Sequence, residues 1–219
     1  GYSISPHDFY VDGIYGLMCQ SSIPTNWLER IDVISGPSTF THGGSSAGKS
    51  VSGAIDLIPK KAKDDPILNF TETFSGRGNW TEAVDIGQRF GKDKEWGVRV
   101  NGAYSDGETF RKKEDMTMGN IFVDIDYNKK NTRANFFYGH THVKEMAPDL
   151  PLNLGKFNVP SAPKLSTNFQ ASWTDYSYNT DILGISFEHD FNKNFTWFLK
   201  AGYQDEDWYS CFESYYPTL

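Results

Sequence analysis

The sequence predicts a mainly β protein, and the chief evidence is a hydrophobic pattern of period two that begins near residue 67. Apolar and polar side chains alternate through seven stretches, near 68–75, 80–90, 96–105, 120–127, 132–142, 183–191 and 195–204. Phe122 and Phe198 interrupt the alternation in two of these stretches. Alternation of this kind is typical of strands whose two faces meet different surroundings. We therefore expect about seven strands of roughly ten residues each, the length that a tilted strand needs to cross a bilayer.

The connections between these stretches favour a membrane barrel over a soluble β fold. Tight polar turns are expected at 91–95, 128–131 and 192–194, and longer connections at 106–116 and 143–181. Only the first connection on the loop side, 76–79, is short. Short turns on one side and longer loops on the other are the layout of outer-membrane barrels. A soluble β-sandwich or solenoid shares the period of two and stays open as an alternative, but it gives no reason to lengthen the loops on one side only.

Composition excludes several other classes. A formal net charge of -7 and a sequence pI of about 5.2 argue against a general nucleic-acid binder. The mean hydropathy of -0.55 argues against a helical membrane protein, whereas barrel strands mix apolar with polar residues and escape this test. Cys19 and Cys211 are too few for a disulfide framework or a zinc site, and we expect them to be unpaired.

The stretch "GGSSAGKS" at 43–50 matches the nucleotide-binding P-loop pattern. A working P-loop follows a buried strand and opens a helix, so that the helix N-terminus can hold the phosphates. Here a turn-rich segment precedes the motif, and the following "VSGAIDLIPK" contains two helix breakers and suits a short strand. We interpret the motif as a Gly/Ser-rich connection between strands and expect no nucleotide binding.

Residues 1–60 carry motifs that point to a family. The stretches "YVDGI" (10–14), "LERIDVISGPS" (28–38) and "SGAIDLIPKKA" (52–62) resemble, in order and spacing, the second half of the plug domain of TonB-dependent outer-membrane receptors, above all the ferric-siderophore receptors. The later "AVDIGQRFGKDKEWGVRVNGAYSDGET" and "GISFEHDFNKNFTW" resemble barrel hairpins of the same receptors. Four residues depart from the family pattern: Ser35, Ser52, Asp56 and Pro59. Ser35 puts in doubt any plug–barrel salt bridge that a basic residue would make there.

The resemblance implies an architecture and an activity. The fold would be a fragment of a plugged outer-membrane β-barrel of about 22 strands. Residues 1–64 would be the C-terminal half of a partly α/β plug domain, and residues 65–219 the N-terminal part of the transmembrane barrel. The activity would be TonB-dependent import of a ferric siderophore across the outer membrane of a Gram-negative bacterium. Iron would be present only within the transported chelate, with no cofactor and no enzymatic activity. TonB would act through an N-terminal segment that this sequence does not contain.

The resemblance also implies where a ligand would bind. In such receptors the outer plug loops help to hold the chelate, and the matching residues here are 4–8 and 15–20. With the long loop they nominate seven substrate contacts: His7, Asp8, Tyr15, Met18, Gln20, Trp173 and Tyr176. A receptor for haem, cobalamin or another large nutrient is the alternative within transport, and a soluble β-rich binding module is the alternative outside it.

Three pairs of residues invite other interpretations. Glu29 and Arg30 would meet either the inner barrel wall or only local partners. His140 and His142 share a strand face at metal-ligand spacing, but a position in an aromatic girdle suits them better than a metal site. Asp124 and Asp126 would face the wet lumen as solvated wall residues rather than as catalytic acids.

The chain is expected to be incomplete. It shows no signal peptide, and seven strands cannot enclose a plug because barrel diameter grows with strand number. We therefore expect a curved open sheet beside a partial plug, with the apolar face of the sheet exposed. Burial of Trp96, Val98, Val123, Ile185 and Trp197 together in one core would instead indicate a soluble module.

Overall fold

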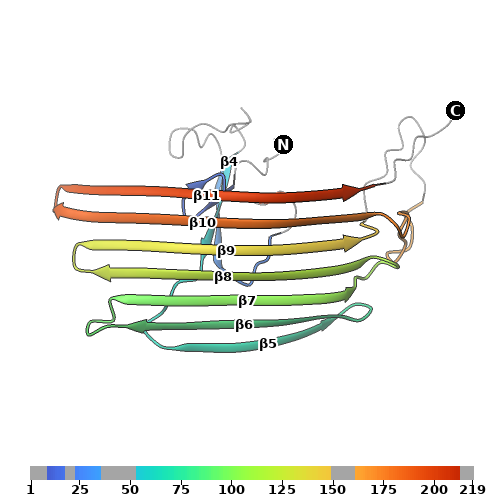
Figure 1. The fold of residues 1–219 in the computed structure, drawn as a ribbon, viewed down its shortest axis with the longest axis horizontal. Helices are drawn as coiled ribbons and strands as arrows, with labels where there is room; N and C mark the ends of the chain where they lie inside the picture. Colours follow the sequence, from blue (N-terminus) through green and yellow to red (C-terminus); the bar gives the residue numbers. More distant parts are fainter. Residues whose placement is uncertain (1–8, 18–22, 36–52, 149–160, 213–219) are drawn as a thin grey trace.

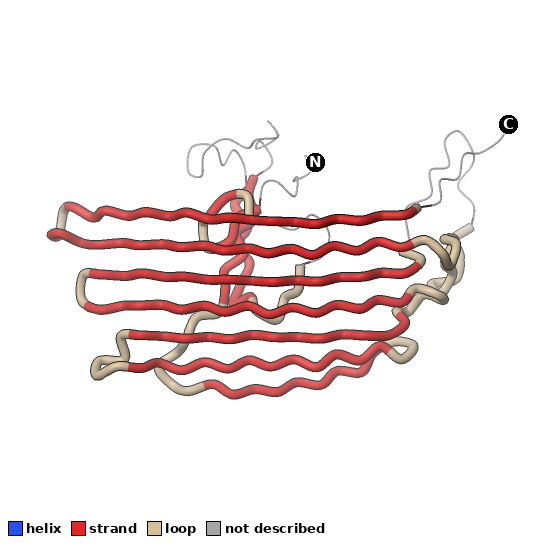
Figure 2. The backbone as a smooth tube through the Cα atoms, viewed as in Figure 1, coloured by secondary structure: helices blue, strands red, loops and turns tan. Residues whose placement is uncertain are grey.

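The computed structural model describes residues 9–17, 23–35, 53–148 and 161–212. Every regular element in these ranges is a β-strand, and they form two sheets (Figures 1 and 2). The described part contains no helix long and apolar enough to span a membrane. The mainly β prediction is confirmed.

The first sheet, called the small sheet here, has the order β2-β1-β4-β3. Its strands are β1 (Phe9–Val11), β2 (Ile14–Tyr15), β3 (Leu28–Ser35) and β4 (Gly53–Pro59). β1 runs parallel to β4, and the other pairs are antiparallel. Asp12 (φ 49°) and Gly13 (φ 73°) connect β1 to β2. Two successive residues with positive φ make the tight turn that Asp-Gly pairs favour in hairpins.

The second sheet, called the wall sheet here, contains seven long strands in sequence order, each antiparallel to the next. They are β5 (Ile67–Ser75), β6 (Asn79–Phe90), β7 (Trp96–Glu108), β8 (Asp115–Lys129), β9 (Thr132–Met146), β10 (Asp175–Asn192) and β11 (Phe195–Cys211). The three tight turns lie where the sequence predicts them. The small sheet packs against one face of the wall sheet, and its strands cross those of the wall (Figure 1).

Strand length is where the prediction needs correction. The later strands reach 15 to 18 residues instead of about ten. In particular, β9 continues to Met146 and β10 begins at Asp175, so the long connection is shorter than the predicted 143–181. The added segments mix polar residues with apolar and aromatic ones such as Tyr176, Tyr178 and Trp208, and the β ladder continues through them because its hydrogen bonds come from the backbone. The regular alternation therefore marks only part of each strand.

The two faces of the wall sheet differ as predicted. The outward face carries large apolar side chains that are exposed, including Trp96 (49%), Ile185 (40%) and Trp197 (46%). The inward face carries buried polar groups such as Arg99, Asn101 and Asp124 beneath the small sheet. The outward residues do not form a buried core, which counts against the soluble-module alternative.

Candidate functional site

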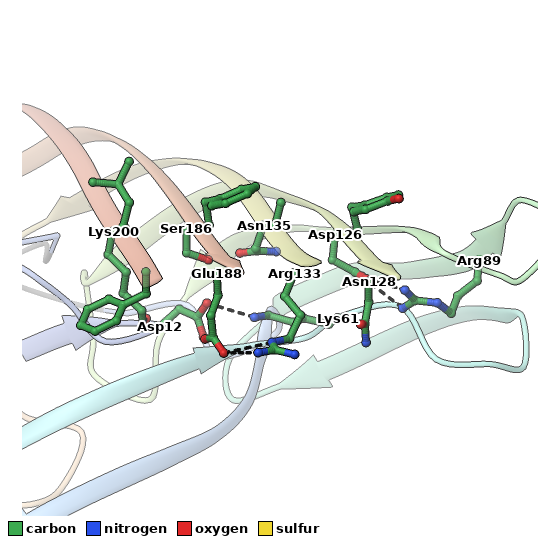
Figure 3. A pocket seen from close by; sticks show the side chains of 15 residues that line it. Asp12, Lys61, Arg89, Asp126, Asn128, Arg133, Asn135, Ser186, Glu188 and Lys200 are labelled. Carbon is green, nitrogen blue, oxygen red and sulfur yellow. Dashed lines mark hydrogen bonds and ion pairs between the residues drawn. The ribbon is translucent and has the colours of Figure 1, made fainter. Parts of the chain in front are cut away.

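The candidate site is the interface between the small sheet and the inward face of the wall sheet. A hollow of about 430 Å³ opens there, toward the end of the wall that carries the tight turns (Figure 3). Its charged lining comes from both sheets: Asp12, Lys61, Arg89, Asp126, Arg133, Glu188 and Lys200. Because the lining contains both acidic and basic side chains, the hollow is polar but has no evident preference for anions or for cations.

Ion pairs on the wall border the hollow. Arg89 on β6 pairs with Asp126 on β8 at 2.5 Å, and its Nη1 also donates to the backbone oxygen of Ala62 at 3.0 Å. Arg133 on β9 pairs with Glu188 and, at 2.7 Å, with Asp190, both on β10. Each pair bridges strands, and Arg89 also ties the wall to the segment that follows β4.

The Asp12–Gly13 turn lies at the edge of the hollow and contacts three charged side chains, Lys61, Lys200 and Asp56. Lys61 Nζ pairs with Asp12 Oδ2 at 3.0 Å, and Lys200 Nζ of β11 donates to the Asp12 backbone oxygen at 2.7 Å. The Gly13 amide donates to Asp56 Oδ1 at 3.0 Å. Burial raises the pKa of the Asp56 carboxyl, although the Gly13 hydrogen bond opposes that shift. The turn is thus fixed by bonds to its own sheet and to the wall.

A second polar contact anchors the start of the β4–β5 connection. Lys60 Nζ lies 3.1 Å from Asp85 Oδ2 on β6, and it also donates to the Asn26 backbone oxygen at 2.6 Å. Arg99 on β7 forms a two-point pair with the same carboxylate, at 2.5 and 2.8 Å. Arg99 is only 3% exposed, so its charge depends on Asp85 for compensation.

An apolar patch lies between the polar contacts. Trp27, which directly precedes β3, stacks on Phe122 of β8, with ring centroids 4.5 Å apart and an angle of 6° between the ring planes. Phe122 stacks in turn on Phe137 of β9, with centroids 5.6 Å apart. Phe122 lies beside Gly139 and Phe137 beside Gly184, each glycine being the register partner on the next strand. The rings lie over these glycines, where a Cβ atom would meet them at 2.8 and 2.1 Å. The absence of side chains at these two positions, on β9 and β10, therefore makes room for a flat aromatic surface on the wall.

Comparison with known proteins shows that the chain is similar to several receptors in sequence and in fold. No family model matches the chain. The ferrichrome receptor FcuA of Yersinia enterocolitica is 28% identical over 204 residues, which is 92% of this chain and 27% of that receptor. The ferric preacinetobactin receptor BauA of Acinetobacter baumannii has the same fold, with a TM-score of 0.92 and 25% identity over 96% of this chain and 31% of BauA. The chain is thus similar in sequence and fold to receptors for ferric siderophores.

The relationship confirms several predictions. FcuA and BauA are receptors, which agrees with the expectation that the chain is not an enzyme, and the fold shared with BauA agrees with the predicted fold class. The ferric-catecholate import receptor Fiu of E. coli K12 shares the fold with a TM-score of 0.77 at 22% identity, over 95% of this chain and 33% of Fiu. The chain thus spans about a third or less of each receptor that it matches.

Three of the seven nominated substrate contacts lie in the described residues. Tyr15 is on β2, with its ring 5.2 Å from that of Tyr10. Trp173 lies before β10 and is 58% exposed. Tyr176 is the second residue of β10 and joins an aromatic cluster with Tyr178, Trp208 and Phe212, at centroid distances of 5.7, 5.9 and 6.2 Å. His7, Asp8, Met18 and Gln20 lie outside the described residues, so their role stays a prediction.

The other interpretations fare differently. Asp124 and Asp126 face inward as expected, but they are buried rather than solvated because the small sheet covers them. Glu29 pairs with Lys63 and Arg30 with Asp32, which are local partners and not the wall. His140 contacts Asp181 at 3.0 Å and His142 contacts Asn179 at 2.7 Å on the outward face. No group of three metal-ligating side chains occurs among the described residues. The P-loop match and Cys19 lie outside the described residues, and Cys211 is a free thiol.

Sequence reasoning missed the residues that join the two sheets. Lys60, Asp85 and Arg99 are charged residues at inward positions of their strands or just after one. The alternation itself could have identified Asp85 and Arg99 as inward-facing. It could not have shown that they meet each other and Lys60, because that depends on how the small sheet is placed.

Proposed function

We propose that this chain is part of a TonB-dependent receptor that imports a ferric siderophore across the outer membrane of a Gram-negative bacterium. In this proposal residues 1–64 belong to the plug and residues 65–219 to the barrel, with the small sheet and the wall sheet as their visible parts. Iron passes through only as part of the chelate, and no covalent chemistry takes place. The mechanism is binding at the outer face followed by movement of the plug.

The observation that carries the proposal is that the two faces of the wall sheet meet opposite surroundings. The outward face of the wall sheet is apolar and exposed, as a lipid-facing wall requires. Its inward face is polar and covered by the small sheet, an arrangement that suits a plugged lumen. The likeness to BauA and to the ferrichrome receptor extends through both sheets and supports the same assignment.

The seven nominated residues are the proposed ligand contacts: His7, Asp8, Tyr15, Met18, Gln20, Trp173 and Tyr176. The aromatic cluster around Tyr176 supports this choice at the loop end of the wall. Tyr178 and Trp208 are register partners on β10 and β11, and they share the inward face with Thr180 and Glu206. Aromatic rings beside hydrogen-bonding groups suit a chelate that presents both apolar and polar surface.

Energy coupling is the less direct part of the proposal. TonB would pull on a segment that precedes the small sheet in the complete receptor. The small sheet meets the wall through polar pairs and through the apolar patch around Trp27 and Phe122. This mixed contact supports a plug that is held in place, and the polar pairs are the part of the contact that water can replace when the plug moves.

The test is transport by the complete receptor in a Gram-negative host that lacks its own siderophore receptors. We expect uptake of radioactive iron as a ferric hydroxamate or catecholate, and loss of uptake when TonB is deleted. Trp173→Ala and Tyr176→Ala should each weaken binding by about 2–10-fold, the worth of one aromatic contact. Tyr203→Ala, on the outward face, is the matched control and should leave binding unchanged. Uptake of haem or cobalamin instead, or uptake that does not need TonB, would contradict the proposal.

A further inference from the structure

Two of the polar contacts between the small sheet and the wall differ in their chemistry. The segment after β4 is tied by the carboxylate of Asp85, which meets Lys60, and by the guanidinium of Arg89, which meets the Ala62 backbone oxygen. The β1–β2 hairpin is tied at its turn by Lys200, whose acceptor is a backbone oxygen and not a carboxylate. The first contact includes an ion pair between the sheets, whereas the second is a charged hydrogen bond to a neutral group.

The exposed side chain of Lys200 reaches directly to the turn. A Cβ atom on Gly13 would lie 2.7 Å from Lys200 Nζ, so the ammonium occupies the space that a side chain would need. The carboxylate of Asp12 is already engaged by Lys61, which leaves its backbone oxygen for Lys200. Two residues further along β11, Gly202 lets the hairpin approach the wall: a Cβ there would meet Ile14 Cγ2 at 2.9 Å and Leu17 Cδ1 at 2.8 Å.

The hairpin turn also bounds the hollow at the tight-turn end of the wall. Asp12, Lys61 and Lys200 line that space together with side chains of β8, β9 and β10 (Figure 3). Displacement of the turn from Lys200 would therefore widen the hollow directly. Displacement of the segment after β4 would instead leave Arg99 buried beside a carboxylate that has lost Lys60.

We propose that Lys200 is a positioning residue that latches the β1–β2 hairpin against β11, and that release of this latch opens the hollow while the Lys60–Ala62 segment stays on the wall. The inference rests on the proposed transport function and assigns the moving part within it. The hairpin carries Tyr15, a proposed ligand contact, only three residues from Asp12. A ligand that shifts Tyr15 would thus act on the latch through a very short piece of backbone.

The first experiment measures hydrogen exchange in the complete receptor with Lys200→Met, which keeps the length of the side chain but removes the donor. The Asp12 amide, bonded to the Leu57 oxygen at 3.0 Å, and the Gly13 amide, bonded to Asp56, should exchange about tenfold faster. The amides of β4 should stay unchanged. Lys200→Arg retains a donor and should restore most of the protection, and Lys63→Met, an exposed lysine outside the latch, is the matched control. Equal exchange in Lys200→Met and the wild type would overturn the latch.

The second experiment fixes the latch shut. Cysteines replace Ile14 and Gly202 in a background whose native cysteines are serine. A Cβ atom at residue 202 would lie 2.9 Å from Ile14 Cγ2, which is one bond from Ile14 Cβ, so the two residues are close enough to test as a disulfide pair. The oxidised receptor should bind the ferric chelate with unchanged Kd but lose uptake, and a reductant should restore uptake. Full uptake by the oxidised receptor would overturn the inference. Failure of the wild type to take up any chelate would instead count against the transport function, while the exchange measurement would still decide on the latch.

Discussion

The two faces of the wall sheet are built from the same strands but meet opposite surroundings. On β7, Val100 faces outward and its neighbour Asn101 faces inward, where it is fully buried. On β8, Val123 faces outward and Asp124 faces inward, also fully buried. A step of one residue along a strand thus changes the surroundings of the side chain from the exposed apolar face to the face that the small sheet covers.

This contrast shows what the small sheet does for the wall. An inward polar residue of an open channel would be bound by water, but here the small sheet has displaced that water. The polar groups must then find protein partners, and Arg99, Asp85 and Lys60 do so with one another. Outward residues need only be apolar, whereas inward residues need a particular neighbour. Mutations on the two faces should therefore differ in what they disturb.

The largest effect is expected from Asp85→Ala on the inward face. Without this carboxylate, Arg99 stays buried with no opposite charge beside it, and Lys60 loses its link to the wall. Loss of one partner from a buried pair costs about 3–5 kcal/mol, and we expect a decrease of that size in the free energy of unfolding of the complete receptor in lipid vesicles. Glu29→Ala removes an exposed pair with Lys63 and should cost less than about 1 kcal/mol. Equal decreases in the free energy of unfolding for the two variants would show that water reaches Arg99 and Asp85 on the inward face.

A somewhat smaller effect is expected from a charge on the outward face. Val123 lies near the middle of β8, and Val123→Arg would place a cation in the apolar band at a cost of about 2–4 kcal/mol. Gln88→Arg on the outward face of β6, two residues from the tight turn, should cost about 0–1 kcal/mol because the charge can reach the interface. The measurement is again unfolding in vesicles. Equal costs for Val123→Arg and Gln88→Arg in vesicles would contradict a lipid-facing wall.

Glycines on the two faces sharpen the comparison further. Gly184→Ala on the inward face puts a Cβ atom against the Phe137 ring, which must leave its place beneath the small sheet, at a cost of about 1–3 kcal/mol. Gly119→Ala on the outward face meets Tyr104 at 3.8 Å, an ordinary contact, and should be neutral or slightly stabilising. The expected signature is a changed Trp27 fluorescence in the first variant only, because Trp27 stacks on the Phe122–Phe137 surface.

The sequence predicted the outward face well and the inward face poorly, for a physical reason. The outward face is recognised from each strand alone, since Trp96, Val98 and Val100 need only alternate with polar residues. The inward face depends on two sheets meeting. Phe122 interrupts the alternation in the sequence, and the structure explains it as the residue on which Trp27 stacks. An apparent error in the strand pattern thus marks the place where the small sheet packs.

The plug side shows the same limit. The Asp12–Gly13 turn could be recognised locally because Asp-Gly between short apolar runs predicts a tight hairpin. Its contact with Lys200 joins residues 188 positions apart and has no local signal. For the same reason Glu29 and Arg30 drew attention as a charged pair, whereas Lys60 makes the contact with the wall.

The smallest effect is expected from Asp56→Asn, which tests how far the small sheet itself is shielded from water. Asparagine keeps an oxygen that can accept a hydrogen bond from the Gly13 amide but removes a carboxylate that burial disfavours, so the free energy of unfolding near pH 7 should change by less than about 1 kcal/mol.

The pH dependence of this difference carries more information than its magnitude at pH 7. Because the folded pKa of Asp56 lies above its ordinary value of 3.8, the folded state binds the proton more tightly than the unfolded state does. Protonation of Asp56 therefore stabilises the wild type at and below about pH 4, and this contribution is lost as pH rises through the folded pKa. The wild type should gain stability relative to Asp56→Asn on acidification, in parallel urea titrations from pH 7 to pH 4. A wild type that instead loses stability relative to the variant would mean that Gly13 and Lys200 outweigh burial, and that the turn is held mainly by charge.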